Sequence, residues 1–295
     1  MTALPDTPCF LDGEYTRLCD AKVSVLDRGF IFGDGVYEVI PVYARRLFRF
    51  DDHIARLGRS LAKVRIAAPA TREQWLERAR ALVAALHAQT GADDQLVYLQ
   101  VTRGVAPRDH VMPPDIVPTV FMMVSPMKPP TADQRHHGVA CTTAADFRWQ
   151  RGDIKSTSLL GAVLARQISA DHGAVETILF RDGWLTEASA SNVWIVHEGA
   201  LLGPPKSEQV LEGIRVELLR ELCEEEGIAY NLRPISEADV RAADEVLLSS
   251  ATKEVLPVTK IDGEPVGHGA LRGKPGPVYA RLHEAYQRAK REQSI

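Results

Sequence analysis

Two residues in the C-terminal half of the chain have side chains that could do chemistry together. Lys155 lies in the segment Arg148–Ser156. Glu187 follows 32 residues later, as the lone acid in the run of small residues Thr186–Asn192. Pyridoxal phosphate chemistry requires an amine and a buried carboxylate, because a lysine holds the cofactor as a Schiff base and an acid keeps its ring nitrogen protonated. The pair therefore predicts an enzyme. The plainer alternatives are a solvated lysine and a loop or capping acid.

Two short segments could bind a phosphate group. Gly213 and Ile214 stand at the start of an expected helix, where backbone N–H groups and the helix dipole favour an anion. Ser250 and Thr252 supply hydroxyl groups at the end of an expected buried strand. Each signal is weak by itself, since short serine and threonine runs usually form turns.

The string Asp27–Glu38 is the most unusual part of the N-terminal half. Its three glycines, Gly29, Gly33 and Gly35, fall within seven residues, with aromatic and acidic residues around them. Such a string makes a poor strand and a poor helix, so it predicts backbone in special φ/ψ regions beside a ligand. Tyr37 would contribute a phenol as donor, while a core tyrosine with a satisfied hydroxyl is the plainer alternative.

Hydrophobic periodicity predicts the elements that must position these side chains. Helices are expected at 52–66, 73–91, 213–227 and 281–290, together with one that Ser156 caps and whose apolar face is Leu159, Leu160, Val163, Leu164 and Ile168. Strands are expected at 10–15 with a turn at Asp12-Gly13, at 96–102, 119–124, 138–143 and 245–248, and in a hairpin with its continuation at 176–180 and 192–197. Lys155 would then lie between a strand end and a helix start, which points a side chain into a cleft.

Length and one proline-rich segment predict two domains. A chain of 295 residues is long for a single compact core. Ser125–Pro130 is rich in proline and has no periodicity, which is typical of a linker. We expect an N-terminal α+β domain at 1–127, a linker at 128–133 and a C-terminal cofactor-binding domain at 134–295. The fold class is therefore α+β or mixed α/β in two lobes.

Composition is ordinary for a soluble globular protein. Apolar residues make up 45% and charged residues 25%, and the net charge of −4 argues against a nucleic-acid partner. No apolar run approaches the ~18 residues of a membrane span, and the start of the chain lacks the pattern of a signal peptide. The four cysteines are far apart, so we expect reduced thiols, no metal site and a cytoplasmic location.

Taken together, six segments resemble the fold-type IV pyridoxal phosphate enzymes over about residues 10–261. They read, in chain order, DRGFIFGDGVYE, HIARL, VTRGVAPRDH, RWQRGDIKSTSLLGAVLA, LTEASASNVW and SSATKEVLPV. Within this superfamily the chain looks most like the D-amino acid aminotransferases. The resemblance implies a two-domain mixed α/β fold with pyridoxal 5′-phosphate in the interdomain cleft.

The resemblance also implies roles for individual residues. Lys155 would be the Schiff-base and proton-transfer lysine, Glu187 the partner of the pyridine nitrogen, and Tyr37 the active-site tyrosine. Arg56 would bind the cofactor phosphate, although its position alone suggests a solvated helix arginine. The remaining residues implied to bind the cofactor are Gly213, Ile214, Arg215, Ser250, Ala251 and Thr252.

Arg108 and His110 match the pair that binds the substrate α-carboxylate in D-amino acid aminotransferases. A guanidinium and an imidazole beside a phenol form a fixed set of donors for a carboxylate. Branched-chain aminotransferases and aminodeoxychorismate lyases do not characteristically carry this pattern. In the D-amino acid aminotransferases the loop reaches the active site of the neighbouring subunit, so the resemblance implies a homodimer.

Four positions depart from the family pattern. The family's Gly-Ile-Thr-Arg motif reads Gly213-Ile214-Arg215-Val216 here, which loses the threonine hydroxyl, and alanines stand at positions 190 and 251 where the family has hydroxyl residues. These changes are expected to weaken cofactor retention and to leave the chemistry intact. The reaction expected is transamination between D-amino acids and 2-oxo acids, with no prediction of the preferred side chain. The alternatives are an aminodeoxychorismate lyase, an (R)-selective amine or branched-chain aminotransferase, and a regulatory cofactor-binding homologue.

Overall fold

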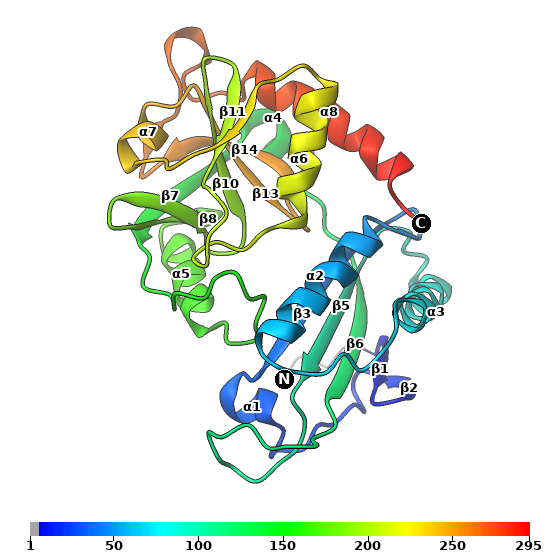
Figure 1. Ribbon diagram of the computed structural model, residues 1–295. Coiled ribbons are helices and arrows are strands. Elements are labelled where there is room, and N and C mark those ends of the chain that lie inside the picture. Colours follow the sequence, from blue (N-terminus) through cyan, green and yellow to red (C-terminus); the bar gives the residue numbers. More distant parts are fainter. Residues whose placement is uncertain (1–5) are drawn as a thin grey trace. The chain divides into compact units, whose positions relative to one another are not determined.

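The computed structural model describes residues 6–295, which form two compact units (Figure 1). Unit 1 contains the chain up to residue 127 together with residues 154–159 and 291–295, and unit 2 contains residues 128–153 and 160–290. Residues 1–5, on which the expectation about a signal peptide rests, lie outside the described part. Across the residues described, no helix is both long enough and apolar enough to cross a membrane.

Two short segments group differently from the expected domains. Residues 154–159 belong to unit 1 because they pair with strand β3 (Gly35–Tyr43): the Tyr37 N–H donates to the Lys155 carbonyl, at 3.0 Å. Residues 291–295 also belong to unit 1, because Leu47 and Ile295 exchange two backbone hydrogen bonds. Both pairings join residues that are far apart in sequence, which periodicity does not reveal.

Unit 1 is built on a six-stranded sheet in the order β2-β1-β6-β5-β3-β4, in which every neighbouring pair is antiparallel. Besides β3, its strands are β1 (Pro8–Leu11), β2 (Glu14–Arg17), β4 (Arg46–Leu47), β5 (Gln95–Thr102) and β6 (Thr119–Pro126). The hairpin expected near residue 12 is confirmed, because β1 and β2 pair across Asp12 and Gly13, which both have positive φ.

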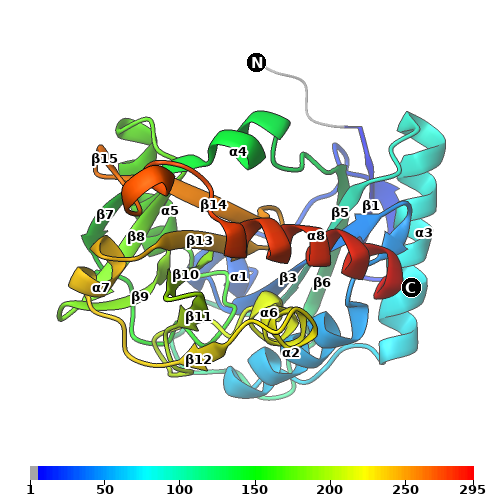
Figure 2. The ribbon, with the colours of Figure 1, turned by 90° about the horizontal axis from the view of Figure 1, so that it is seen from above.

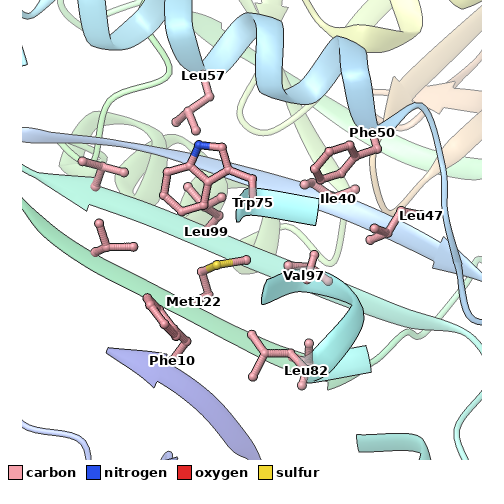
Figure 3. Packing of buried hydrophobic residues seen from close by; sticks show 14 of the residues in the cluster. Phe10, Ile40, Leu47, Phe50, Leu57, Trp75, Leu82, Val97, Leu99 and Met122 are labelled. Atoms are coloured by element: carbon pink, nitrogen blue, oxygen red, sulfur yellow. The ribbon is translucent and has the colours of Figure 1, made fainter. Parts of the chain in front are cut away.

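Two long helices supply the core of unit 1. Helix α2 (Phe50–Lys63) and helix α3 (Arg72–Thr90) pack their buried side chains against those of the sheet, with Trp75 among Leu57, Leu99 and Met122 (Figure 3). Thr71 caps the start of α3, and Gly91 ends it with a φ of 73°. Both helices were expected from periodicity, and both are confirmed within a few residues.

The glycine-rich string is more regular than its composition suggests. It forms the one-turn helix α1 (Arg28–Phe32), which the Asp27 carboxylate caps, and it then enters β3. Gly33 ends α1 with a φ of 65°, so the expected special backbone is found there. A Cβ at Gly35 would lie 2.8 Å from the Val101 carbonyl oxygen, so the close approach of β5 requires a glycine.

Unit 2 contains a nine-stranded mixed sheet in the order β12-β11-β10-β13-β14-β7-β8-β9, with β15 beside β14. Its strands are β7 (Val139–Ala145), β8 (Glu176–Arg181), β9 (Trp184–Ala188), β10 (Asn192–His197), β11 (Ala200–Gly203), β12 (Tyr230–Leu232), β13 (Glu245–Ser250), β14 (Glu254–Ile261) and β15 (Glu264–Pro265). The expected hairpin after β8 needs correction: its partner is β9, which carries Glu187, whereas β10 pairs with β11 and β13.

The helices of unit 2 are α4 (Ala132–His137), α5 (Leu160–Asp171), α6 (Ile214–Glu225), α7 (Glu237–Arg241) and α8 (Pro277–Glu292), with a 3-10 turn at Gly269–Leu271. Helix α8 runs along β13 and β14 between α4 and α6 (Figure 2). The buried Glu245 carboxylate accepts hydrogen bonds from the Val278 and Tyr279 N–H groups and so caps α8.

Helix α5 differs from its expectation in two ways. It begins at Leu160, because Ser156 is not a cap but forms a bridge with Val36 in unit 1. Its apolar face is also not in the core, since Leu160, Val163 and Leu164 are 72%, 59% and 51% exposed. A periodic pattern identifies an apolar stripe without showing what covers it.

Candidate active site

The expected site residues divide between the two units. Unit 1 carries Tyr37, Arg56, Arg108, His110 and Lys155. Unit 2 carries Glu187, Gly213, Ile214, Arg215, Ser250, Ala251 and Thr252. The structure brings Lys155 together with Tyr37, and it places Arg108 and His110 against the same ring, Phe32. The contacts of the other residues are described one by one below.

Lys155 is held through its backbone and leaves its amine available. Its carbonyl accepts from the Tyr37 N–H, and its own N–H donates to the Ser60 Oγ at 3.4 Å. The Lys155 Nζ lies 4.1 Å from the centroid of the Tyr37 ring. Among residues 6–295, no carboxylate forms an ion pair with this amine. An amine held by an aromatic face rather than by a carboxylate can more readily take part in covalent chemistry.

A second tyrosine extends this aromatic surface. The Tyr98 ring stacks on Tyr37 at a centroid distance of 5.7 Å, and its hydroxyl donates to the Gln100 Oε1 at 2.7 Å. Burial, together with Tyr37, raises the pKa of Tyr98 to about 12, so its hydroxyl stays protonated. We did not expect Tyr98 from the sequence. The strand register that sets Val39 opposite Tyr98 is the only signal for it, and this register requires the sheet.

Arg56 is buried, not solvated as its position in a helix suggests. It lies on α2 one turn after His53, and both side chains bond the fully buried Glu38. The Arg56 Nε and Nη2 each lie 2.7 Å from a Glu38 carboxylate oxygen. Burial alone would raise the pKa of Glu38, but the charge and hydrogen bonds of Arg56 outweigh it and hold that pKa well below its ordinary range. The guanidinium is therefore fixed in orientation by a charged partner.

Glu187 is a buried acid with one cationic partner. The Arg148 Nη1 donates to its Oε1 at 2.7 Å, and the Leu211 N–H approaches its Oε2 at 3.3 Å. Burial raises the pKa of Glu187, while the charge of Arg148 acts in the opposite direction. Arg148 also forms two hydrogen bonds of 2.9 Å with Asp146. No local pattern in the sequence points to Arg148, since it lies 39 residues from Glu187.

The start of helix α6 is open to an anion. Gly213 occupies the N-cap and has no side chain with which to cap it, and a Cβ there would collide with the Asn192 Oδ1. Backbone N–H groups at a helix start favour a negatively charged ligand. Ile214 is buried, and the buried Arg215 donates from Nε to the Tyr286 hydroxyl at 3.2 Å. Arg215 is thus linked to α8 and does not face solvent.

The turn Ser250–Thr252 lies between β13 and β14 and is tied to the turn that follows Glu187. The Ser250 Oγ accepts from the Lys253 N–H at 3.1 Å. The Lys253 Nζ in turn donates to the fully buried Glu176, at 2.7 Å. Glu176 also accepts hydrogen bonds from Ser189 and Ser191. One buried carboxylate therefore joins the two turns.

Arg108 and His110 lie on an exposed loop beside Phe32. The Arg108 Cζ is 5.6 Å and the His110 ring centroid 5.3 Å from the centroid of the Phe32 ring. Both side chains are exposed, so their donors can reach a ligand. A guanidinium and an imidazole next to each other suit a carboxylate.

Comparisons with known proteins identify the family of this chain. A family model described as amino-transferase class IV matches residues 35–261. The D-alanine aminotransferase of Staphylococcus haemolyticus is 37% identical over 96% of this chain and 97% of the relative, and that of Bacillus licheniformis is 38% identical over 94% of each. Among solved structures, the branched-chain amino acid aminotransferase of Escherichia coli matches with a TM-score of 0.86 at 24% identity, covering 96% of this chain and 94% of that one.

A second solved structure, the branched-chain aminotransferase of the archaeon Thermoproteus uzoniensis with norvaline, has a TM-score of 0.83 at 25% identity and covers 96% of this chain and 94% of that one. The chain therefore belongs to the aminotransferase class IV family. It is an aminotransferase with the fold-type IV architecture, so the resemblance and the fold class expected from the sequence are confirmed.

Proposed function

We propose that this chain catalyses pyridoxal 5′-phosphate-dependent transamination between D-amino acids and 2-oxo acids. The observation that carries the proposal is the Lys155 amine, which lies over the Tyr37 ring without an acidic partner in the described part of the chain. The substrate class rests on the similarity to D-alanine aminotransferases and on the exposed pair Arg108 and His110.

Each unit carries groups whose chemistry suits the proposed cofactor. Lys155 supplies the amine for a covalent link, and Glu187 supplies a buried carboxylate that Arg148 orients. The glycine-capped start of α6 at Gly213 offers N–H groups to a phosphate, and Arg56 adds a fixed guanidinium. When bound, pyridoxal phosphate supplies an electron sink for the negative charge that develops at the substrate α carbon.

Residues of this chain would carry out the proton transfer, keep the ring nitrogen protonated and bind the substrate carboxylate. Lys155 carries the proton from the substrate α carbon, because a free amine can act as base and then as acid. Glu187 would keep a proton on a ring nitrogen next to it. Arg148 donates a hydrogen bond to this carboxylate, and its charge opposes the rise in the Glu187 pKa that burial causes. Arg108 and His110 hold the α-carboxylate, which fixes the face of the α carbon that is presented to Lys155.

An absorption experiment tests the reaction and its stereochemistry together. D-alanine without any 2-oxo acid should change the absorption band of the protein-bound cofactor, and pyruvate should restore it. L-alanine should leave the band unchanged. A purified protein that takes up no pyridoxal phosphate, or that responds only to L-alanine, would show the proposal to be wrong.

Arg108→Ala is expected to raise the KM for D-alanine by roughly 10- to 100-fold, since a hydrogen bond to a charged group contributes about 1.5–3 kcal/mol. An (R)-amine that has no carboxylate should be affected much less. Steady-state kinetics on both substrates check this, with Arg80→Ala, an exposed arginine on α3, as the control. Equal effects on the two substrates would contradict the proposed carboxylate site.

We further propose that the protein is a homodimer. Exposed apolar side chains occur in the segment before α1, on α1, in the Arg108 loop and on α5, at Val25, Phe30, Val105, Val111, Met112, Val117, Leu160 and Val163. The segment before α1, α1 itself and the Arg108 loop lie side by side. Backbone hydrogen bonds join Arg28 to Gly104 and Ala106 to Leu26. Apolar surfaces of this kind are typical of protein interfaces.

The double variant Leu160→Glu, Val163→Glu is expected to convert the dimer to a monomer, because two charges would have to be buried in the interface. Light scattering after size exclusion measures the change. Leu271→Glu, at an exposed leucine elsewhere in unit 2, should leave the mass unchanged. A wild-type protein that is monomeric would exclude the homodimer.

We also propose that the protein works in the cytoplasm. Cys9, Cys19, Cys141 and Cys223 all carry free thiols, and three of the four are buried. Free thiols of this kind are typical of a reducing compartment. An oxidised cysteine pair in protein purified without reductant would argue against this location.

A further inference from the structure

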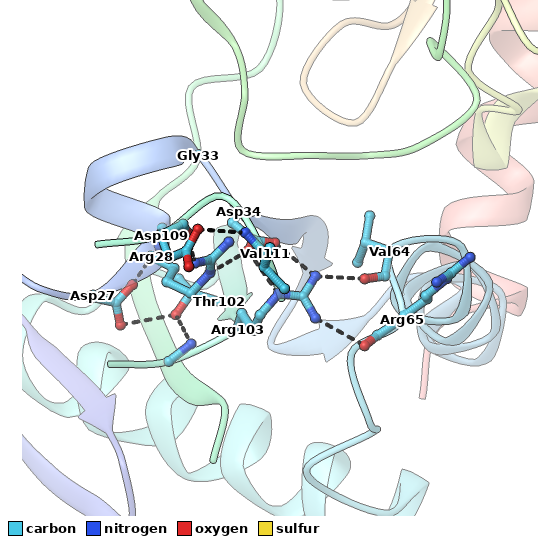
Figure 4. Close-up of polar contacts among 12 residues, drawn as sticks. Asp27, Arg28, Gly33, Asp34, Val64, Arg65, Thr102, Arg103, Asp109 and Val111 are labelled. Atoms are coloured by element: carbon cyan, nitrogen blue, oxygen red, sulfur yellow. Dashed lines mark hydrogen bonds and ion pairs between the residues drawn. The ribbon is translucent and has the colours of Figure 1, made fainter. Parts of the chain in front are cut away.

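One buried side chain donates a hydrogen bond to the backbone of the loop that carries Arg108 and His110. The loop residues between Pro107 and His110 are exposed and belong to no helix or strand. Arg28, which is 4% exposed, donates from Nη1 to the Asp109 carbonyl at 2.5 Å (Figure 4). This bond fixes the backbone of Asp109, which lies between Arg108 and His110, the two residues proposed to donate hydrogen bonds to the substrate carboxylate.

Asp34 accepts hydrogen bonds from two buried arginines, Arg28 and Arg103. Its Oδ2 accepts from the Arg28 Nε at 2.8 Å and from the Arg103 Nε at 2.7 Å (Figure 4). Arg103 then donates to the Val64 and Arg65 carbonyls at the end of α2. The two arginines are buried to the same extent, and only Arg28 bonds the loop. Burial raises the pKa of Asp34, but hydrogen bonds and charge from Arg103 and Arg28 outweigh it, so the carboxylate stays ionised.

Phe32 lies in the same segment as Arg28 and Asp34, and its ring contacts the side chains of the loop. The Cζ atoms of Arg28 and Arg108 lie 4.8 and 5.6 Å from its ring centroid, and the His110 ring centroid lies 5.3 Å away. An aromatic face attracts a guanidinium and restricts where it can move. The residues 28–34 thus contact both the backbone of the loop and its two donor side chains.

We propose that Arg28, fixed by Asp34, and Phe32 are positioning residues that preorganise Arg108 and His110 for a substrate α-carboxylate and so set the selectivity for amino acids over simple amines. The inference rests on the proposed function. Arg108 and His110 are exposed on an irregular loop, so without these contacts the loop would have to be ordered when substrate binds. The free energy needed to order the loop would weaken substrate binding, and it would leave the rate of proton transfer by Lys155 largely unchanged.

Arg28→Lys and Arg103→Lys form a matched pair that tests the backbone contact. Each removes one guanidinium from Asp34, but only the first removes the bond to the Asp109 carbonyl. We expect Arg28→Lys to raise the KM for D-alanine about tenfold while kcat falls less than about threefold, because one hydrogen bond near a charged group is weakened. Arg103→Lys should lower the melting temperature comparably and leave the KM near that of wild type. Equal KM values in the two variants would overturn the proposal.

Phe32→Leu and Phe32→Tyr test the ring and keep the inference falsifiable if Arg28→Lys does not fold. Leucine keeps an apolar side chain without an aromatic face, and tyrosine keeps the face. Phe32→Leu should raise the KM for D-alanine by about fivefold, in the range of an exposed cation–π contact, and Phe32→Tyr should restore it to within about twofold. A Phe32→Leu variant with the wild-type KM would overturn the role of the ring.

Calorimetric binding of isobutyrate separates this inference from the proposed function. Isobutyrate carries the carboxylate of D-alanine with a methyl group in place of the amine, so it binds without turnover. Its Kd should rise by the same factor as the KM in Arg28→Lys and Phe32→Leu. A wild-type protein that binds isobutyrate but does not react with D-alanine would exclude the proposed reaction and leave the positioning roles to be judged by Kd. A wild-type protein that binds no isobutyrate would overturn the inference itself.

Discussion

Lys155→Ala is expected to lower the turnover of D-alanine by about 10⁴-fold or more, because it removes both the nucleophilic amine and the proton carrier. The fold should survive, since Lys155 is held through its backbone bonds to Tyr37 and Ser60 and its side chain forms no ion pair in the part of the chain that is described. Stopped-flow absorption with D-alanine measures the rate, and circular dichroism checks the fold.

Lys155→Arg is the control that separates charge from chemistry. An arginine keeps a cation over the Tyr37 ring but stays protonated, so it can neither form the covalent link nor accept a proton. We expect it to be as inactive as the alanine variant. Turnover near the wild-type rate in either variant would show that Lys155 is not the nucleophilic amine and proton carrier.

Glu187→Gln is expected to lower kcat by roughly 10²- to 10³-fold, the size of effect seen when one electrostatic partner of a transition state is removed. A neutral amide cannot hold a proton on a ring nitrogen as a carboxylate can. Folding should be little affected, because Arg148 keeps its two bonds to Asp146. Single-turnover rates with D-alanine measure the loss.

Glu187→Asp is the matched variant, since it keeps the charge on a shorter side chain. It should recover a substantial part of the rate. If the glutamine variant reacts as fast as wild type, Glu187 does not act on the reacting system. If the aspartate variant is as slow as the glutamine variant, the distance to the carboxylate matters more than its charge.

Local sequence signals predicted the elements whose boundaries are set locally. The α3 helix ends at Gly91 and α6 is capped by Gly213, as expected from glycine positions and apolar spacing. Signals of this kind cannot show contacts between distant residues. The grouping of residues 154–159 with β3 depends on pairing across more than 100 residues, and the exposure of α5 depends on what lies beside it.

The candidate site divides in the same way. The resemblance supplied roles for Lys155 and Glu187. It supplied none for Arg148 or Asp34, although both lie in the matching strings, because their contacts with residues 39 and 69 positions away are seen only in the fold. Contacts between charged residues that are far apart in sequence produce no periodic pattern. An Asp or Arg that forms such a contact therefore cannot be told from a solvated one by sequence alone.

The way the chain returns to unit 1 has a consequence for synthesis. Unit 1 takes up residues 154–159 and then the last five residues, 291–295, which pair with β4. A ribosome that has made only the first 127 residues has therefore produced a sheet that lacks two of its hydrogen-bonded neighbours. Its closing contacts have high sequence separation, which slows folding. The sheet of unit 1 is therefore completed by segments that are synthesised after all of its own strands.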